Sequence, residues 1–317
     1  MSTTSASLRG QLVGRVMAHG LRLAKGRRDL HDGSTLEDLA AEVARMRPRL
    51  EAIASRVRVP ADTVVEDVVG APVPAEWVRP HGRDAGDGPV VVHLHGGAYT
   101  LGSPATHRGM TNALATASRG TSFVPDYRLA PEHPFPSAVD DALSAYRWLV
   151  DDADVAPGRI AVSGDSAGGG LALALLLRLR DEGLPLPACY VGLSPWTDLT
   201  GSAPSIVDNA DRDVLFGAVP TALAGRVGEL YHGDTAHPMV SPLFADLSGL
   251  PPMLVHVGGH ELIRDDGLRL VDRARDHGVD ASAGVFAGMW HVFQAFPIPE
   301  TRRSMREIGG FVRRHTS

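Results

Sequence analysis

Short apolar segments alternate with longer helical patterns over most of this sequence. The segments VVVHLHGG, TSFVPDY, IAVSGDS, CYVGLSP and MLVHVGG are largely apolar, as expected of strands that are buried on both faces of a parallel sheet. Helical patterns separate most of them, for example over residues 136–150 and 168–181. Two more polar runs, TVVEDVVG and AEWVRP, precede these segments, and ASAGVFAG follows them. Together the eight runs predict an α/β protein with a mostly parallel, eight-stranded sheet that has an antiparallel start.

Composition narrows the classes of partner. The chain has 317 residues, of which 44% are hydrophobic, so it can bury a substantial core. Its net charge is −6, with 31 basic and 37 acidic residues spread along the chain. A nucleic-acid surface needs a concentrated basic face, so we expect a small-molecule partner and no nucleic acid. The single cysteine excludes an internal disulfide and a CxxC motif.

The N-terminal region predicts helices and no membrane span. Charged residues such as Arg9 and Arg15 interrupt its apolar stretches, so that no segment of signal-peptide length appears. No window of the chain approaches the ~18 apolar residues of a spanning helix, and we expect a cytoplasmic protein. Ser34 and Glu37 resemble a capping box, and apolar residues then recur at helical spacing up to a predicted end near Val57.

The alternation of strand and helix is interrupted between Pro195 and Pro242. This interval has no clear strand pattern, and it is rich in glycine, proline and aspartate before a predicted helix over residues 221–231. An insertion of this length over the carboxyl ends of the strands would act as a lid or cap.

The strongest local motif is a serine between two glycines. Gly164, Ser166 and Gly168 form a GxSxG pattern, which alone is a weak signal. Here it lies where a buried strand turns into a helix rich in alanine and leucine, and small neighbours allow the sharp turn that exposes the hydroxyl. This context favours a nucleophilic serine over a tight turn with a capping serine.

An activated serine also needs donors for the oxyanion and a base. Gly96 and Gly97 follow another buried strand in HLHGGAYTLGS, so their N–H groups, with that of Ala167, can face a developing negative charge. No GxGxxG or GxxxxGK[ST] phosphate loop is present. His291 follows the last predicted strand and can reach the same edge of the sheet, although a lone histidine among aromatic residues is often only a packed core residue.

These motifs together resemble a known family. HGGAYTLGS, DYRLAPEHPFPSAVDDALSAYRWL, GDSAGG, SPWTDLTGS, VSPLFADLSGLPPMLVHVGG and MWHVF are similar to the hormone-sensitive-lipase-like (family IV) carboxylesterases of the α/β-hydrolase fold, over residues 64–311. The resemblance implies Ser166 as nucleophile, His291 as base, and an oxyanion hole formed by Gly96, Gly97 and Ala167. It also implies a helical cap over residues 1–57 and 196–235, on a core of residues 58–195 and 236–317. Asp165, Asp126, Arg128 and Glu132 then belong to the scaffold.

The base also needs a carboxylate that fixes the histidine tautomer, the third member of a catalytic triad. This acid is the one ambiguous member. Related sequences carry an aspartate in loops similar to DPLRDEG or SDEVLLDD, whereas this chain has HELIRDDG, with His260 where the second form has its aspartate. Glu261 lies 30 residues before His291, close to the family's usual gap, and Asp265 lies 26 residues before it. Glutamate is an accepted acid in this role. We therefore predict Glu261, with Asp265 or the absence of a working acid as the alternatives.

A metal site in this loop is a weaker hypothesis. His260 and position 264 have the spacing of helical ligands, but Arg264 cannot bind a metal. A solvated or capping role is expected for His260, Asp265 and Asp266. The sequence thus predicts no metal and no cofactor.

The function predicted is that of a serine carboxylesterase for small or short-acyl esters, acting through an acyl-enzyme. Its activity should fall as the pH drops through about 6 to 7, because a histidine base must be neutral. An N-acetyl or amide deacetylase with the same triad is the alternative within the enzyme class. A catalytically silent ligand-binding member of the fold is the alternative from another class, and a lyase is disfavoured by the intact serine. A homodimer is also expected, because edge strands often pair.

Overall fold

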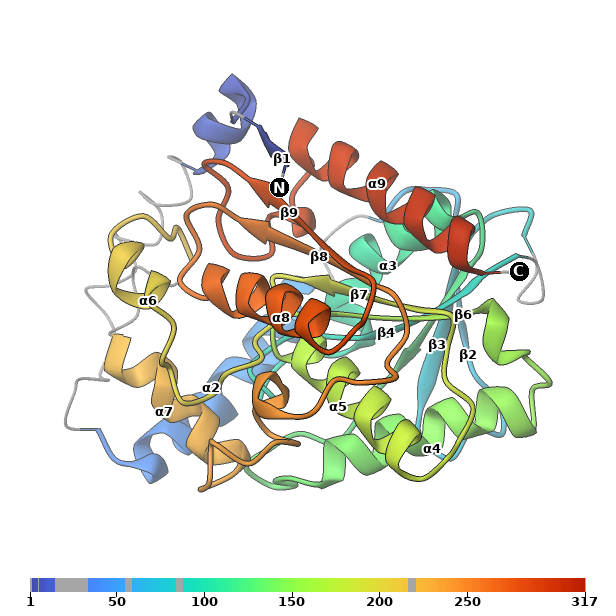
Figure 1. The fold of residues 1–317 in the computed structure, drawn as a ribbon, viewed down its shortest axis with the longest axis horizontal. Helices are drawn as coiled ribbons and strands as arrows, with labels where there is room; N and C mark the ends of the chain where they lie inside the picture. The colour runs from blue at the N-terminus through green and yellow to red at the C-terminus, as the bar shows by residue number, and fades with distance from the viewer. Residues whose placement is uncertain are drawn as a thin grey trace.

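The computed structural model describes residues 2–4, 6–14, 34–54, 59–83, 88–215 and 221–316. Within these ranges, nine strands form a single sheet in the order β1-β9-β8-β7-β6-β4-β5-β3-β2 (Figure 1). The strands are β1 (Ser2–Thr4), β2 (Thr63–Asp67), β3 (Ala75–Pro80), β4 (Val90–Leu94), β5 (Thr121–Pro125), β6 (Ile160–Asp165), β7 (Cys189–Leu193), β8 (Met253–Gly258) and β9 (Ala281–Phe286). The α-helices with defined bounds are α2 (Leu36–Ala54), α3 (Pro104–Ser118), α4 (Ser137–Asp151), α5 (Ala167–Asp181), α6 (Ser205–Asp208), α7 (Thr221–Tyr231), α8 (Arg264–Asp276) and α9 (Pro299–His315).

The eight predicted strands are all present, as β2 to β9. β3 pairs antiparallel with β2 and with β5, and the remaining pairs are parallel. The predicted α/β-hydrolase sheet with an antiparallel start is therefore confirmed. β1 is an additional short strand that pairs with β9, with Ser2 opposite Gly284. The segment predicted to hold the N-terminal cap helices, residues 1–57, thus also contains a strand at Ser2–Thr4, and its residues 1, 5, 15–33 and 55–57 lie outside the described residues.

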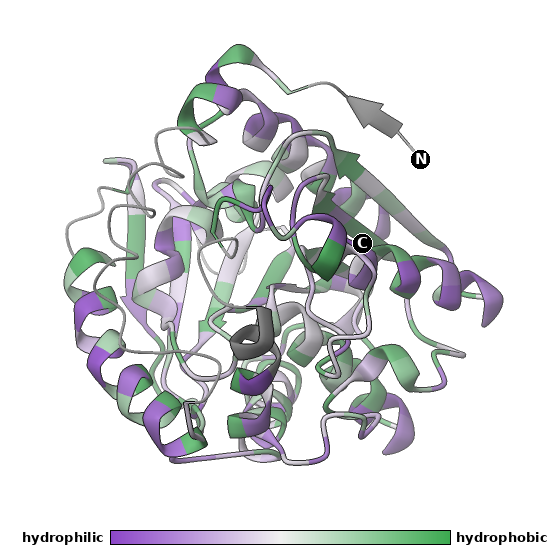
Figure 2. Cartoon of the chain, turned by 90° about the vertical axis from the view of Figure 1, so that its left-hand side faces the viewer, coloured by the Kyte–Doolittle hydropathy of each residue, from purple (hydrophilic) through white to green (hydrophobic). Residues whose placement is uncertain are grey.

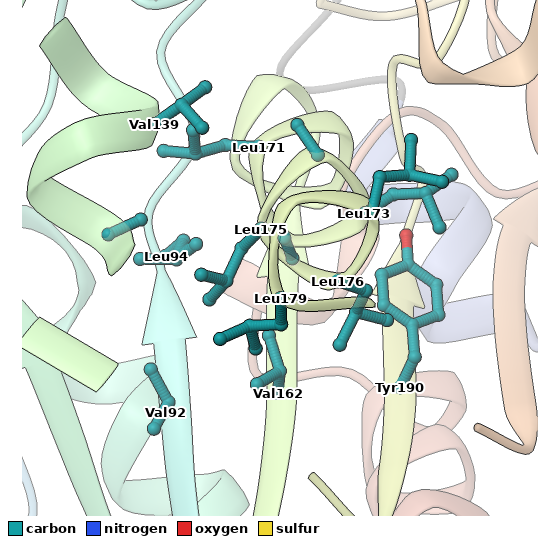
Figure 3. Close-up of a cluster of buried hydrophobic side chains, with 14 of the residues drawn as sticks. Val92, Leu94, Val139, Val162, Leu171, Leu173, Leu175, Leu176, Leu179 and Tyr190 are labelled. Atoms are coloured by element: carbon teal, nitrogen blue, oxygen red, sulfur yellow. The ribbon is translucent and has the colours of Figure 1, made fainter. Parts of the chain in front are cut away.

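Helices cover both faces of the sheet. On one face, α5 lays Leu171, Leu175 and Leu179 against Val92 and Val162 of the central strands (Figure 3). These leucines recur every four residues, so they form one apolar stripe along the helix. α4 and α8 extend this cluster, whereas α3 and α9 pack on the opposite face. The strands β4 to β8 are buried along their whole length, which explains why their sequences are so apolar.

Most helix limits agree with the sequence pattern. α7 has the predicted bounds, and α5 begins one residue before the predicted start. At the start of α2 the capping box is shifted by one residue. The Oγ1 of Thr35 accepts from the N–H of Asp38, and the Asp38 carboxylate accepts from the N–H of Thr35. Thr35 and Asp38 therefore take the capping roles that were predicted for Ser34 and Glu37.

Two helices from distant parts of the chain lie together at one end of the molecule. α2 packs against α7 through Leu39, Val43 and Leu230 (Figure 1). Leu101, from the loop that follows β4, joins the same cluster. Along the helices, hydrophilic residues alternate with hydrophobic ones (Figure 2), the pattern of helices with one face on a core and one in water. None of the helices in the described ranges has the length and apolar character needed to cross a membrane.

Candidate active site

Ser166 occupies a strained turn between β6 and α5. Its backbone has φ 52° and ψ −125°, a conformation that residues with a side chain seldom adopt. A Cβ at Gly164 would lie 2.2 Å from the carbonyl oxygen of Gly168, and a Cβ at Gly168 would lie 2.0 Å from that of Leu94. Both flanking positions therefore require glycine, which is the physical basis of the GxSxG pattern.

Backbone hydrogen bonds hold this turn in place. The N–H of Ser166 donates to the carbonyl of Leu193 at 2.9 Å, and the carbonyl of Ser166 accepts from the N–H of Trp196 at 2.8 Å and of Gly169 at 3.0 Å. The end of β7 thus supports the serine from one side. Ser166 is only 8% exposed, so a substrate must reach it in a largely enclosed position.

Asp165, which precedes the serine, is part of a buried histidine cluster. Its Oδ1 lies 3.1 Å from Nε2 of His93 and 3.4 Å from Nε2 of His107. Burial by itself would raise the pKa of Asp165, but the charge of His107 and the hydrogen bonds of both histidines outweigh it and keep that pKa well below its usual range. These contacts agree with the scaffold role expected for Asp165.

In the loop after β4, the N–H of Gly96, one of the predicted oxyanion donors, is bound to another residue. The N–H of Gly96 donates to Oδ1 of Asp165 at 3.0 Å. A Cβ on Gly96 would lie 2.3 Å from the other oxygen of that carboxylate. The expectation that Gly96 donates to an oxyanion is therefore corrected, because its N–H already has a carboxylate partner, and this partner is the reason that position 96 must be glycine.

The next residues of the loop have unusual backbone angles. Gly97, Ala98 and Tyr99 have φ values of 127°, 54° and 60°. The carbonyl of Gly97 accepts from the N–H groups of Thr100 at 3.0 Å and Leu101 at 2.8 Å, which closes a tight turn. Within the described ranges, the N–H groups of Gly97 and Ala98 have no hydrogen-bond acceptor, and neither does that of Ala167. The sequence did not indicate Ala98, because an alanine gives no sign of the positive φ that directs its N–H.

Glu261 and His291 meet at the carboxyl ends of neighbouring strands. Oε2 of Glu261 lies 3.6 Å from Nδ1 of His291, and the two side chains are 0% and 4% exposed. β8 and β9 are adjacent in the sheet, so the loops that carry these residues emerge side by side. Of the carboxylates predicted for this role, Glu261 is therefore the one that contacts the histidine.

Ser194 connects the two loops and was not singled out from the sequence. Its Oγ donates to Oε2 of Glu261 at 2.6 Å and accepts from the N–H of Val292 at 3.1 Å. Ser194 directly follows β7 and has φ 49°, so its side chain leaves the strand end at an unusual angle. Its place in the motif SPWTDLTGS was visible, but a polar residue after a strand gives no sign of its partners.

Burial dominates the electrostatics of Glu261. It raises the pKa of this carboxyl, and the contacts with His291 and Ser194 offset only part of the shift. Two residues of the insertion after β7 hold the backbone of Glu261 and of the next residue, Leu262. Nδ2 of Asn209 donates to the carbonyl of Glu261 at 2.9 Å, and Oδ2 of Asp213 accepts from the N–H of Leu262 at 2.8 Å. The predicted cap insertion thus helps to shape the acid loop.

The other acidic residues of this loop have separate partners. Oδ2 of Asp265 accepts from the N–H of Ser205 at 3.0 Å, at the start of α6. Oδ2 of Asp266 accepts from the N–H groups of Thr197 at 3.1 Å and Asp198 at 3.0 Å. Asp265 therefore caps, as expected. Asp266 is fully buried, so a solvated role is wrong for it, because its carboxyl anchors the loop after β7.

His260 precedes Glu261 in the chain and bonds to a different part of the protein. Its N–H donates to the carbonyl of Met289 at 2.9 Å. Partial burial, together with the charges of Arg212 and Arg264, lowers the pKa of His260. Among the residues whose positions are described, no three histidine, cysteine, aspartate or glutamate side chains are grouped to hold a metal ion.

Comparison with known proteins identifies the family. The model of a family with the alpha/beta hydrolase fold matches residues 91–295. The chain is 42% identical over 246 residues to an acetyl-hydrolase of Streptomyces hygroscopicus, covering 76% of this chain and 80% of the relative. It is 38% identical over 228 residues to an esterase of Acinetobacter venetianus, covering 70% and 74%. The crystal structure of an esterase from the bacterial hormone-sensitive lipase family superposes with a TM-score of 0.85 at 38% identity, covering 99% of this chain and 100% of the other. The chain therefore belongs to the α/β-hydrolase-fold family, and within it to the bacterial hormone-sensitive lipase esterases.

Proposed function

We propose that this protein is a serine carboxylesterase that hydrolyses small or short-acyl esters through an acyl-enzyme. The observation that carries the proposal is the strained turn at Ser166, between β6 and α5, together with the buried pair of Glu261 and His291. These residues follow β6, β8 and β9, in the chain order nucleophile, acid, base that α/β-hydrolases use. Ester hydrolysis is also the activity named for the esterase relatives.

The proposed reaction has two stages. Oγ of Ser166 attacks the ester carbonyl while His291 accepts its proton, and the tetrahedral intermediate collapses as His291 protonates the departing alcohol. Water then attacks the acyl-enzyme with His291 as base, which releases the carboxylic acid and restores the serine. Glu261 holds the imidazole in one tautomer and stabilises its protonated form.

We assign the oxyanion to the amides of Gly97, Ala98 and Ala167. The carbonyl oxygen gains negative charge at each tetrahedral step, and N–H groups without other acceptors stabilise it best. These three amides fit that description within the described part of the chain, whereas the N–H of Gly96 is bound to Asp165. Gly96 is then a scaffold residue, and its bond to Asp165 fixes the start of the loop after β4, which we call the oxyanion loop.

The preference for small esters is supported by the enclosure of the serine. Ser166 is 8% exposed, and the loop that carries the proposed oxyanion donors packs against α2 and α7. An enclosed site favours compact acyl groups. A series of p-nitrophenyl esters from acetate to palmitate tests this point. We expect kcat/KM to be highest for the short chains, and a maximum at the long chains would contradict it.

Amide or N-acetyl hydrolysis is the second candidate, favoured by the likeness to an acetyl-hydrolase. The same serine, base and acid serve both bonds. p-Nitrophenyl acetate and p-nitroacetanilide differ only in the bond that breaks, so their rates separate the two activities. Faster cleavage of the ester, lost in Ser166→Ala, supports the carboxylesterase. Preference for the anilide would replace it with the deacetylase.

Two further expectations accompany the proposal. We place the enzyme in the cytoplasm and expect a small-molecule ester as its partner, with homodimerisation through a sheet edge and no role for nucleic acid. Fractionation of the native cells and light scattering of the purified chain test the location and the oligomeric state.

A further inference from the structure

The proposed oxyanion loop has a conformation that its own sequence does not favour. Ala98 and Tyr99 have φ values of 54° and 60° although neither is glycine. Such residues persist in this region only where the surrounding structure holds them. The contacts that hold this loop therefore decide whether the amides of Gly97 and Ala98 point at a substrate.

The side chain of Arg47 contacts this loop from outside the sheet. Arg47 lies on α2, and its Nε donates to the carbonyl of Thr100 at 2.7 Å. Its Nη2 donates to the carbonyl of Ala130, and its Nη1 donates to Glu132 at 2.8 Å. The N–H of Ala130 in turn donates to the carbonyl of Tyr99 at 2.9 Å. A single guanidinium therefore spans the loop and the segment that holds the loop.

The second helix at this end of the molecule holds the same loop from another direction. The ring of Tyr99 stacks on the ring of Tyr231, with centroids 3.8 Å apart and planes 6° apart. Tyr231 is the last residue of α7, and both rings are buried. Because α7 also packs against α2, the two helices and the loop form one unit.

We propose that Arg47 is a positioning residue for the oxyanion hole, and that α2 and α7 couple the proposed cap to catalysis through Arg47 and Tyr231. This inference rests on the proposed esterase function. Arg47 does not touch the reacting atoms in this account. It holds the carbonyl of Thr100, in the loop, and the carbonyl of Ala130, whose N–H bonds to Tyr99, so that the amides of Gly97 and Ala98 stay directed at the oxyanion.

The test separates positioning from general stabilisation. Arg47→Met keeps the aliphatic stem but removes all three donors. We expect kcat to fall by about 10- to 100-fold with KM changed little, because the donors act on the transition state and one oxyanion donor is worth about 10²- to 10³-fold. The inhibition constant for a trifluoromethyl ketone, whose adduct with the serine carries an oxyanion, should rise by a similar factor. Arg47→Lys should restore part of both.

Two matched variants serve as controls. Arg45 lies on the same helix and pairs only with Glu42 among the contacts described for it, on the surface. Glu132→Gln removes the charge partner of Arg47 but leaves its bonds to the two carbonyls. Arg45→Met and Glu132→Gln should keep kcat and the inhibition constant within about twofold of the wild type. A loss in Arg45→Met equal to that in Arg47→Met would overturn the proposal.

Further outcomes are equally decisive. If Arg47→Met lowers only the melting temperature, with kcat and the inhibition constant unchanged, the positioning role is wrong. If Arg47→Met does not fold, Tyr231→Leu tests the same coupling from α7, and unchanged kinetics there would overturn it. A wild-type protein that neither cleaves nitrophenyl esters nor reacts with a fluorophosphonate would overturn the proposed function, and this inference with it. An active wild type with an unaffected Arg47→Met overturns only the inference.

Discussion

Oε2 of Glu261 lies 3.6 Å from Nδ1 of His291, and both side chains are buried. Oγ of Ser194 donates to the same carboxylate oxygen at 2.6 Å. The distance to the histidine slightly exceeds that of a good hydrogen bond, as is common in enzymes without substrate. The geometry places a glutamate, one methylene longer than aspartate, beside the proposed base, whereas Asp265 accepts from the N–H of Ser205 at the start of α6.

Glu261→Gln should separate activity from stability. The amide cannot accept the Nδ1 proton of His291 in the same way, so we expect kcat/KM to fall by about 10²- to 10⁴-fold. Burial raises the pKa of Glu261, so the protonated carboxyl stabilises the fold. This stabilisation is fully present below the ordinary pKa of 4.5 and is lost as pH rises through the raised pKa. The melting temperature at pH 7 should therefore stay the same or rise.

Asp265→Asn is the matched control for this variant. Steady-state kinetics and thermal melts of both proteins are needed, and Asp265→Asn should keep kcat/KM within about threefold of the wild type, since its carboxylate caps a helix. If Asp265→Asn loses activity and Glu261→Gln keeps it, the acid is misassigned.

Ser194→Ala should weaken both loops that Ser194 connects. It removes a hydrogen bond to a buried carboxyl and leaves the N–H of Val292 without its acceptor. We expect the free energy of unfolding to fall by about 1 to 3 kcal/mol, and kcat/KM to fall by about 10-fold as His291 loses its fixed position. Denaturant titration and ester hydrolysis measure the two effects. Ser144→Ala, at an exposed serine whose one partner among the described residues is the carbonyl of Asp140, should change neither, and equal effects in the two variants would refute the bridging role.

Glycine substitutions should differ sharply with position. Gly168→Ala would place a Cβ 2.0 Å from the carbonyl oxygen of Leu94 and 2.4 Å from that of His95. Because both contacts are backbone, we expect a loss of about 3 kcal/mol or more. Gly109→Ala lies within α3, where a Cβ meets nothing within 4 Å, so it should gain up to about 1 kcal/mol. Denaturant unfolding of the two variants measures the difference. Similar free energies of unfolding would contradict the close packing at Gly168.

Acid should destabilise the fold partly through His256. Burial lowers the pKa of His256 to about 4, against an opposing effect of the Glu307 charge and with the charge of Arg303 also lowering it. Its Nδ1 lies 2.8 Å from Oγ of Ser304 on α9. Because the folded pKa is below the ordinary 6.5, the stability from neutral His256 is present above about 6.5 and is lost as pH falls toward 4.

The size of this effect can be measured from unfolding curves. A shift of this size corresponds to about 3 kcal/mol at most. The free energy of unfolding should therefore fall between pH 7 and pH 4, and less steeply in His256→Gln than in the wild type. His133→Gln, at an exposed histidine, should keep the wild-type slope. An unchanged slope in His256→Gln would exclude this group as a source of the acid sensitivity.

Local sequence patterns predicted the sheet and the turn at Ser166, because the residues that determine each of them lie close together in the sequence. The strands β4 to β8 are buried along their length, so apolar runs mark them without reference to other parts of the chain. The glycines around Ser166 are required by contacts within the turn and with β4, and the GxSxG pattern records this requirement. The limits of α7 also follow from its own residues.

Features that depend on distant contacts could not be predicted in this way. β1 consists of the polar residues Ser2–Thr4, and only pairing with β9 makes it a strand. The N–H of Gly96 is occupied by Asp165, which lies 69 positions along the chain, so the motif alone suggested a free donor. Ser194 and Arg47 were missed for the same reason, since their partners are 67 and 53 residues away.

The most direct test of the proposed mechanism is labelling with a fluorophosphonate, followed by mass spectrometry of the labelled peptide. We predict one label per chain, on Ser166, with the proton of its hydroxyl passing to His291 as fluoride leaves. Ser166→Ala should take up no label, and Glu261→Gln should react at the same residue but more slowly. A label that persists in Ser166→Ala, or that maps to another residue in the wild type, would contradict the assignment of Ser166 as the nucleophile.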